Sequence, residues 1–248
     1  MKCGCLYFHQ GWTDIMNQLS LINYYNSIYD ELNVIMRRDA EYLVNFYIRN
    51  LKGVTTQYIE LNGRYHVPDG YDILFHGLLD PHRNDKYKNK FVEYCQDPSR
   101  YKIFTEGFYV AYDIPHNVKV DYFTLERDLF TEQKTYNSVV KEYGEKYVIY
   151  HADPTNNSGI ATTIDFPASC ANLPKINLNG ASPIFFNYLE TIYNAQEIHL
   201  IDSIWASLCY QMDAKYGFFK DKQINVYTKR GHRIMFEIPK HLKNWNII

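Results

Sequence analysis

The chain has 248 residues, of which 46% are hydrophobic and 22% charged, enough for one large or two small domains with a substantial core. This balance excludes wholesale disorder. The formal net charge of −2 gives no overall attraction to nucleic acid, whose binding proteins usually carry a basic patch. We therefore expect a globular protein without a nucleic-acid partner.

The charge is unevenly distributed along the chain. Residues 215–245 hold eight Lys or Arg against two Asp or Glu. An anionic ligand would prefer this end of the molecule. A solvated basic surface explains the same pattern equally well.

The spacing of the cysteines and the length of the apolar segments indicate the cellular compartment in which the protein works. The five cysteines, at positions 3, 5, 95, 170 and 209, lack the paired spacing of a zinc site or a disulfide framework. No stretch approaches the roughly 18 apolar residues of a membrane span, and the N-terminus does not resemble a signal peptide. We expect a cytoplasmic protein without a transmembrane segment, with peripheral membrane attachment as an alternative.

The amino-acid composition indicates the kind of organism that the protein comes from. Tyr, Asn, Ile and Lys are abundant, as in AT-rich genomes, so a large DNA virus, a phage or an AT-rich microbe is expected. A viral protein of this kind would work in the host cytoplasm.

In the first half of the chain, strand-like and helix-like segments alternate in a βαβ rhythm. The expected strands are 5–9, 32–36, 54–61 and 71–75. The expected helices are 15–29, with apolar residues on one face, and 39–49, which Asp39 can cap. Residues 80–102 are polar and weakly helical, and residues 105–113, followed by Pro115, end this region.

A second α/β series follows a helix-like stretch at 132–143. Its expected strands are 146–150, 175–179, 197–201 and 224–228, and its expected helices are 183–194 and 203–216. Two successive series predict an α/β protein with two Rossmann-like lobes, 1–135 and 136–248, that face each other across a cleft.

In open parallel sheets, the loops at the carboxyl ends of the strands line the ligand site. The first such loop is Gly11-Trp12-Thr13-Asp14, which opens the first helix. Glycine allows a tight turn and close approach to a ligand, and the helix N-terminus offers unpaired N–H groups. A carboxylate here also complements the helix dipole, so an ordinary helix start remains an alternative for Asp14.

The second loop runs from His151 to Gly159 with the sequence HADPTNNSG. Its small polar residues suit contacts with phosphate or sugar, although a surface turn would look the same. A metal pair of His151 and Asp153 would need a third ligand, and none stands at a suggestive spacing. We expect no metal site.

The third loop follows the apolar strand that ends at Ile201. Asp202 and Ser203 then open a helix, which makes a good platform for an anion and a ribose. Ser203 as a simple N-cap is the alternative.

Two segments resemble glycosyltransferases of the GT-B architecture, particularly the fucosyltransferase-like and heptosyltransferase-like groups. HQGWTD, residues 9–14, is similar to their acceptor-side first loop, and IHLIDSIWASL, residues 198–208, to their donor-side strand, loop and helix. The resemblance implies transfer of a sugar from a nucleotide-diphosphate-sugar donor to a hydroxyl of a glycan or glycoconjugate. It places the acceptor on the N-terminal lobe and the nucleotide sugar on the C-terminal lobe, with no other cofactor.

The resemblance also implies roles for single residues. Asp14 would be the catalytic base, with Gly11, Trp12 and Thr13 at the acceptor. The residues implied at the donor are His151, Asp153, Ser158, Asp202, Ser203, Lys229 and Arg230. Of these, the last two would neutralise the departing diphosphate. The sequence has no Asp-x-Asp motif and no clear covalent nucleophile, which favours metal-independent transfer with inversion.

Two other functions fit the same loops. One is a non-catalytic carbohydrate- or nucleotide-binding protein, in which replacement of Asp14 by Asn would leave function intact. The other is a nucleotide-sugar epimerase, which would convert the donor sugar without a second substrate.

Overall fold

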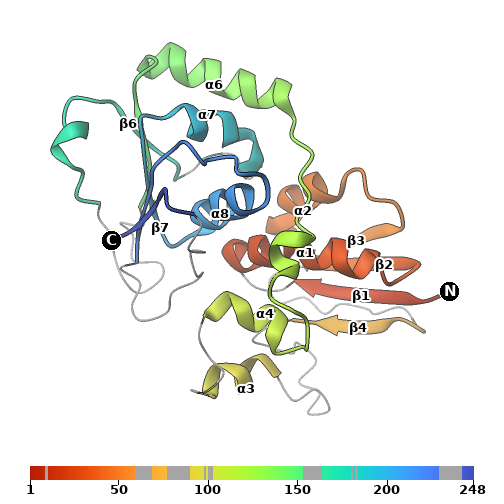
Figure 1. Cartoon of the computed structure of the whole chain (residues 1–248). Coiled ribbons are helices and arrows are strands. Elements are labelled where there is room, and N and C mark those ends of the chain that lie inside the picture. Colours follow the sequence, from red (N-terminus) through yellow and green to blue (C-terminus); the bar gives the residue numbers. More distant parts are fainter. Residues whose placement is uncertain are drawn as a thin grey trace. The chain divides into compact units, whose positions relative to one another are not determined.

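The computed structural model describes residues 1–8, 11–59, 69–76, 90–97, 99, 103–152, 164–179, 181, 184–228 and 242–248. By its internal contacts the chain divides into two units, Met1–Leu125 and Glu126–Ile248 (Figure 1). Each unit holds one parallel sheet with helices, which confirms the expected α/β class. The expected boundary near residue 135 lies inside a helix of the second unit, Leu129–Tyr143.

The first unit contains a four-stranded parallel sheet in the order β3-β2-β1-β4. Its strands are β1 (Cys3–Phe8), β2 (Glu31–Arg37), β3 (Val54–Ile59) and β4 (Asp72–Phe75). Each lies within a few residues of an expected strand. Tyr7 of β1 pairs with Ile35 on one side and Phe75 on the other, so β1 is an inner strand.

The helices of the first unit are α1 (Trp12–Asn26), η1 (Arg38–Ala40), α2 (Glu41–Ile48), α3 (Lys90–Gln96), η2 (Phe104–Glu106), α4 (Gly107–Val110) and α5 (Val118–Asp121). Helix α1 is buried from Ile15 to Ile22, including three polar residues. The segment that follows α3 covers α1: Ser20 Oγ donates to the Lys119 carbonyl, 2.6 Å away, and Tyr109 Oη to the Asn17 carbonyl at 2.7 Å.

The second unit contains a five-stranded parallel sheet in the order β6-β5-β7-β8-β9. Its strands are β5 (Val148–His151), β6 (Lys175–Asn177), β7 (Glu197–Ile201), β8 (Ile224–Tyr227) and β9 (Trp245–Ile247). The last strand, β9, was not expected from the sequence.

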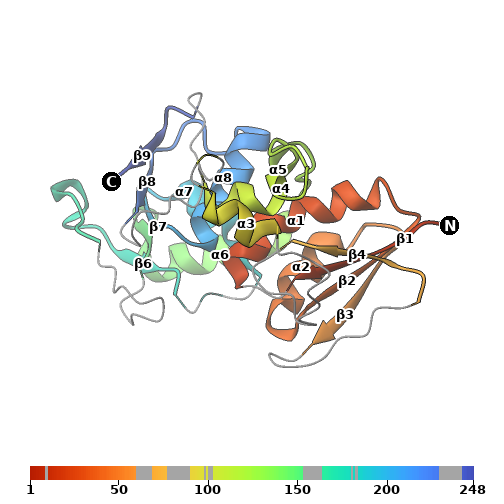
Figure 2. The same ribbon diagram turned by 90° about the horizontal axis from the view of Figure 1, so that it is seen from below.

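The helices of the second unit are α6 (Leu129–Tyr143), η3 (Ala168–Cys170), η4 (Phe185–Tyr188), α7 (Leu189–Asn194) and α8 (Ile204–Tyr216). Right-handed crossovers put the β6–β7 and β7–β8 connections on one face of the sheet and the β5–β6 connection on the other. Figures 1 and 2 show α7 and α8 on one side and the segment before β6 on the opposite side. In its described part, that segment contributes only the short η3.

Candidate functional site

Asp14 lies in the first turn of α1, just after the inner strand β1. The chain moves from β1 to β2 on one side, whereas β4 lies on the other side, so the strand order reverses at β1. Ligands of open parallel sheets bind at the carboxyl ends of strands at such a reversal. Asp14 therefore stands where a ligand of this sheet is expected.

Gly11 and Trp12, two of the three residues before Asp14, are exposed. Gly11 has φ −65° and ψ 164°, and no described atom lies within 4 Å of where its Cβ would be. Its conformation suits any residue, so the tight turn expected here does not explain the glycine. Trp12 keeps 39% of its surface exposed, and Thr13 is half-buried. An exposed indole beside a carboxylate is suited to contact with a sugar ring.

The protonation behaviour of Asp14 departs from that of an ordinary first-turn carboxylate. Burial raises the pKa of Asp14 to about 7, and a hydrogen bond with the Gly11 backbone only partly opposes this rise. A residue whose main task was to complement the helix dipole would have a lowered pKa. Asp14 is instead balanced between its two protonation states near neutral pH, as a general base or acid requires.

His76 follows β4, the strand on the other side of the reversal, and was not singled out in the sequence. Its Nδ1 lies 2.7 Å from the Phe108 carbonyl, which can only accept, so Nδ1 carries the proton. Nε2 then accepts from the Tyr25 hydroxyl at 2.6 Å. Burial lowers the pKa of His76 to about 4, so this neutral imidazole has a structural role.

In the second unit, three predicted donor residues come together at the carboxyl edge of the sheet. His151 ends β5 and pairs with Leu200 of the adjacent β7, while Asp202 and Ser203 directly follow β7. The strand order reverses between β5 and β7. Asp202 and Ser203 are each 3% exposed, although both belong to a loop.

Ser203 occupies the N-cap position of α8 but does not act as a cap. Its side chain makes no capping hydrogen bond, and its buried hydroxyl has no partner among the residues that the structure describes. The simple N-cap interpretation therefore fails. A buried hydroxyl beside the free N–H groups of a helix start is suited to bind an anionic or sugar oxygen.

Four of the predicted donor residues lie outside the described residues: Asp153, Ser158, Lys229 and Arg230. Their roles stay predictions.

A separate pocket of about 660 Å³ lies on the face of the second sheet opposite α7 and α8. Its floor includes His199 and Asn225, which are register partners on neighbouring strands, and Asn246 continues the row on β9. Asp165, Pro167 and Ser169 form part of its wall. The sequence contained a signal for this face: Glu197 and His199 alternate with apolar residues along β7, so both point to one side.

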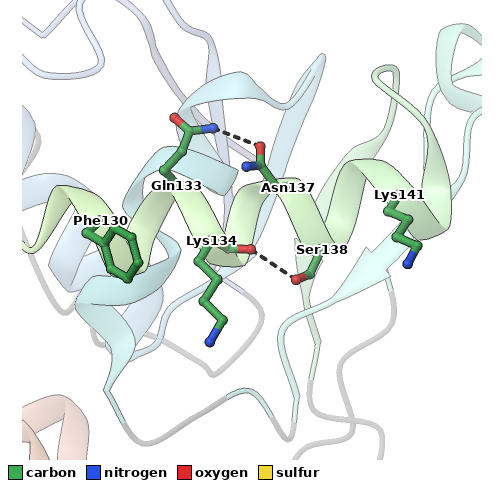
Figure 3. Close-up of a pocket in the computed structure, with 6 residues that line it drawn as sticks. All are labelled: Phe130, Gln133, Lys134, Asn137, Ser138 and Lys141. Carbon is green, nitrogen blue, oxygen red and sulfur yellow. Dashed lines mark hydrogen bonds between the residues drawn. The ribbon is translucent and has the colours of Figure 1, made fainter.

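Figure 3 shows a second hollow, of about 400 Å³, lined by residues of α6. Gln133 Nε2 donates to Asn137 Oδ1 at 2.9 Å, and Ser138 Oγ donates to the Lys134 carbonyl at 3.0 Å. These polar groups bond along their own helix. The hollow is therefore a feature of the helix surface, in contrast to the pocket on the sheet.

Comparison with protein-family models, with curated proteins and with solved structures finds no match to this chain. In the described part of the chain, no helix has the length and apolar character needed to cross a membrane.

Proposed function

We propose that the protein is a GT-B-type glycosyltransferase. It would move a sugar from a nucleotide-diphosphate-sugar donor to a hydroxyl of a glycan or glycoconjugate, without a metal and with inversion. The first unit would bind the acceptor and the second the donor. The observation that carries this proposal is Asp14, a carboxylate at a strand-to-helix junction whose pKa of about 7 suits a general base.

The proposed reaction is a direct displacement. Asp14 takes the proton from the acceptor hydroxyl as the hydroxyl oxygen forms a bond to the anomeric carbon of the donor sugar. The bond between that carbon and the diphosphate oxygen breaks, and the nucleoside diphosphate leaves with the electron pair. Transfer of this kind needs a base at the nucleophile and positive charge at the leaving group.

The second unit offers support at the leaving group. The first turn of any helix leaves backbone N–H groups without a partner inside the helix. At the start of α8, the Ser203 hydroxyl is buried without a described partner. A diphosphate oxygen would satisfy both kinds of donor and gain from the helix dipole. By the resemblance, Lys229 and Arg230 would add positive charge at the leaving group.

The carboxyl edges of the two sheets also suit two other functions. A non-catalytic binder would use the donor edge without proton transfer, and an epimerase would act on the donor alone. A non-catalytic binder needs no general base, so the raised pKa of Asp14 favours an enzyme over a binder. Product analysis separates the transferase from the epimerase, which would convert the donor without an acceptor.

The test combines donor binding with turnover. We would screen nucleoside diphosphates and nucleotide sugars by thermal shift, with and without Mg²⁺ or Mn²⁺, on the wild type and on Asp14→Asn. We expect one nucleotide family to stabilise both proteins without metal, because the proposal assigns Asp14 to the acceptor and not to the donor. With that donor and a panel of glycan acceptors, Asp14→Asn should lose at least about 100-fold in transfer rate.

A matched control is Glu41→Gln, which removes another first-turn carboxylate that follows a strand of the same sheet. This variant should transfer at the wild-type rate. Absence of a shift with every nucleotide would contradict the donor assignment. Unchanged turnover in Asp14→Asn would contradict the assignment of the base, and conversion of the donor alone would point to the epimerase.

A further inference from the structure

Three side chains with metal-binding atoms converge at the pocket on the second sheet. Cys170 ends η3, while Glu197 and His199 lie on β7, and one ligand atom from each lies within 4.8 Å of the other two. Cys170 Sγ is 3.9 Å from His199 Nε2, which is 3.0 Å from Glu197 Oε2. Donors bound to one tetrahedral Zn²⁺ are separated by roughly 3 to 4 Å, given metal–ligand bonds of about 2.0–2.3 Å.

The arrangement differs from that of a cysteine nucleophile with a histidine base. In such a site the cysteine and the acidic residue bond to different nitrogens of the histidine. Here Cys170 and Glu197 both approach Nε2, while Nδ1 lies 2.9 Å from the Tyr227 hydroxyl. Three donor atoms within 4.8 Å of one another suit a cation rather than a proton relay.

The thiol of Cys170 is also poorly suited to nucleophilic attack. Burial, together with the neighbouring Glu197, raises the pKa of Cys170 to about 11. A bound Zn²⁺ would displace the thiol proton and hold the thiolate.

The surroundings can support a bound ion. Without metal, Nε2 of His199 must carry the proton that Glu197 accepts, so Nδ1 accepts from Tyr227. An ion at Nε2 would replace that proton, and Nδ1–H would then donate to the Tyr227 oxygen, fixing the ring. Ser169 Oγ donates to the second carboxylate oxygen of Glu197 at 2.7 Å and holds it in place.

Among the described residues, Lys175 is a positive charge close to Cys170. Lys175 Nζ contacts the carbonyls of Cys170, Ala171 and Leu173 at 3.0 to 3.4 Å. These carbonyls hold the ammonium on the backbone side of η3. The charges of one thiolate and one carboxylate would balance those of the divalent ion.

We propose that Cys170, Glu197 and His199 bind one Zn²⁺ ion, with a fourth coordination position open towards the pocket. A mixed set of sulfur, nitrogen and oxygen ligands is typical of zinc, and a three-residue set leaves room for water. Cys170 and His199 are at most 1% exposed, whereas the Glu197 side chain is 26% exposed, so the ion would be reached from the Glu197 side. This site lies on the sheet face and is independent of the proposed transferase activity.

The test uses the full chain, freed of any affinity tag, stripped with EDTA and dialysed against Zn²⁺ or Co²⁺ alone. We expect about one Zn²⁺ per chain, a rise in melting temperature, and with Co²⁺ a thiolate-to-metal charge-transfer band. Cys170→Ser should abolish that band. Glu197→Gln, at a half-buried position that should tolerate the change, should weaken Zn²⁺ binding at least about tenfold.

Cys3→Ser is the matched control, because Cys3 Sγ also lies beside a carboxylate, 4.0 Å from Glu31 Oε2. This variant should bind Zn²⁺ as the wild type does. Failure to retain Zn²⁺, or equal retention by Glu197→Gln and wild type, would overturn the proposal. The nucleotide thermal shifts of these variants should equal those of the wild type, so the zinc site and the transferase are tested separately.

Discussion

Asp14 could act either as a carboxylate that stabilises its helix or as a general base, and its surroundings distinguish the two roles. A first-turn carboxylate usually stabilises a helix, and the sequence pattern alone allows that interpretation. Burial of Asp14 at the end of β1 has the opposite consequence, because it disfavours the charged form. The two interpretations predict stability effects of opposite sign.

The prediction concerns the pH dependence of stability. The folded-state pKa of Asp14 is raised to about 7, so the unfolded chain releases this proton at lower pH than the folded chain does. The favourable contribution of protonated Asp14 is therefore fully present below about pH 4 and lost as pH rises to about 7. Asp14→Asn should then be more stable than the wild type at pH 8, by up to about 4 kcal/mol, and equally stable near pH 4.

Urea denaturation at pH 4.5 and pH 8 would measure this difference. A variant that is less stable than the wild type at pH 8 would show that the helix-dipole role dominates.

Ser203 gives a second prediction at the residue scale. Replacing an N-cap serine with alanine ordinarily costs about 1 kcal/mol, because a backbone N–H loses its partner. The Ser203 hydroxyl makes no capping bond and lacks a described partner. We therefore expect Ser203→Ala to change the free energy of unfolding by less than about 0.5 kcal/mol, and to weaken nucleotide binding. Chemical denaturation and nucleotide thermal shifts measure the two effects, and a large loss of stability with unchanged binding would contradict the proposed role.

The C-terminal end of α8 is capped by a glycine. Gly217 follows the helix in the left-handed conformation, with φ 61°, and its N–H bonds to the Asp213 carbonyl at 2.8 Å. No described atom lies within 4 Å of a Cβ at this position, so strain in the backbone is the only expected cost of a side chain. Gly217→Ala should lower stability by about 1 kcal/mol, and Gly217→Asn by less, since asparagine tolerates this conformation. Equal losses in both variants, measured by urea denaturation, would argue against this cause.

At the scale of elements, the sequence predicts every described strand except β9. β7 was placed at its observed bounds because Ile198 and Leu200 form a recognisable apolar strand. β9, which contains Trp245 and Asn246, was missed because a three-residue strand carries too little pattern and depends on β8 for its pairing. Burial of α1 on both sides was also unpredictable, because its cover comes from residues about 90 positions later.

The same distinction applies to the candidate sites. The positions of Asp14, Asp202 and Ser203 next to strand ends were predictable because strand-to-helix junctions are local features. The cluster of Cys170, Glu197 and His199 was missed because Cys170 lies 29 residues before His199, and only the fold brings them together. Spacing along the chain identifies metal sites only when the ligands lie on one short motif.

At the scale of the whole molecule, each sheet is built from one continuous stretch of chain. All strands of the first sheet end by Phe75, and those of the second begin at Val148. Among the described strands, none belongs to the sheet of the other unit. Parallel strands pair slowly, because each pairing must wait for the connection between them.

This arrangement affects how the protein folds while it is synthesised on the ribosome. The first unit is fully synthesised once Leu125 has left the exit tunnel, while the strands of the second unit are still to come. Domains generally fold as units during synthesis, the N-terminal one first. The nascent chain can therefore complete its first sheet before any strand of the second exists to compete for pairing, which removes one common route to misfolding.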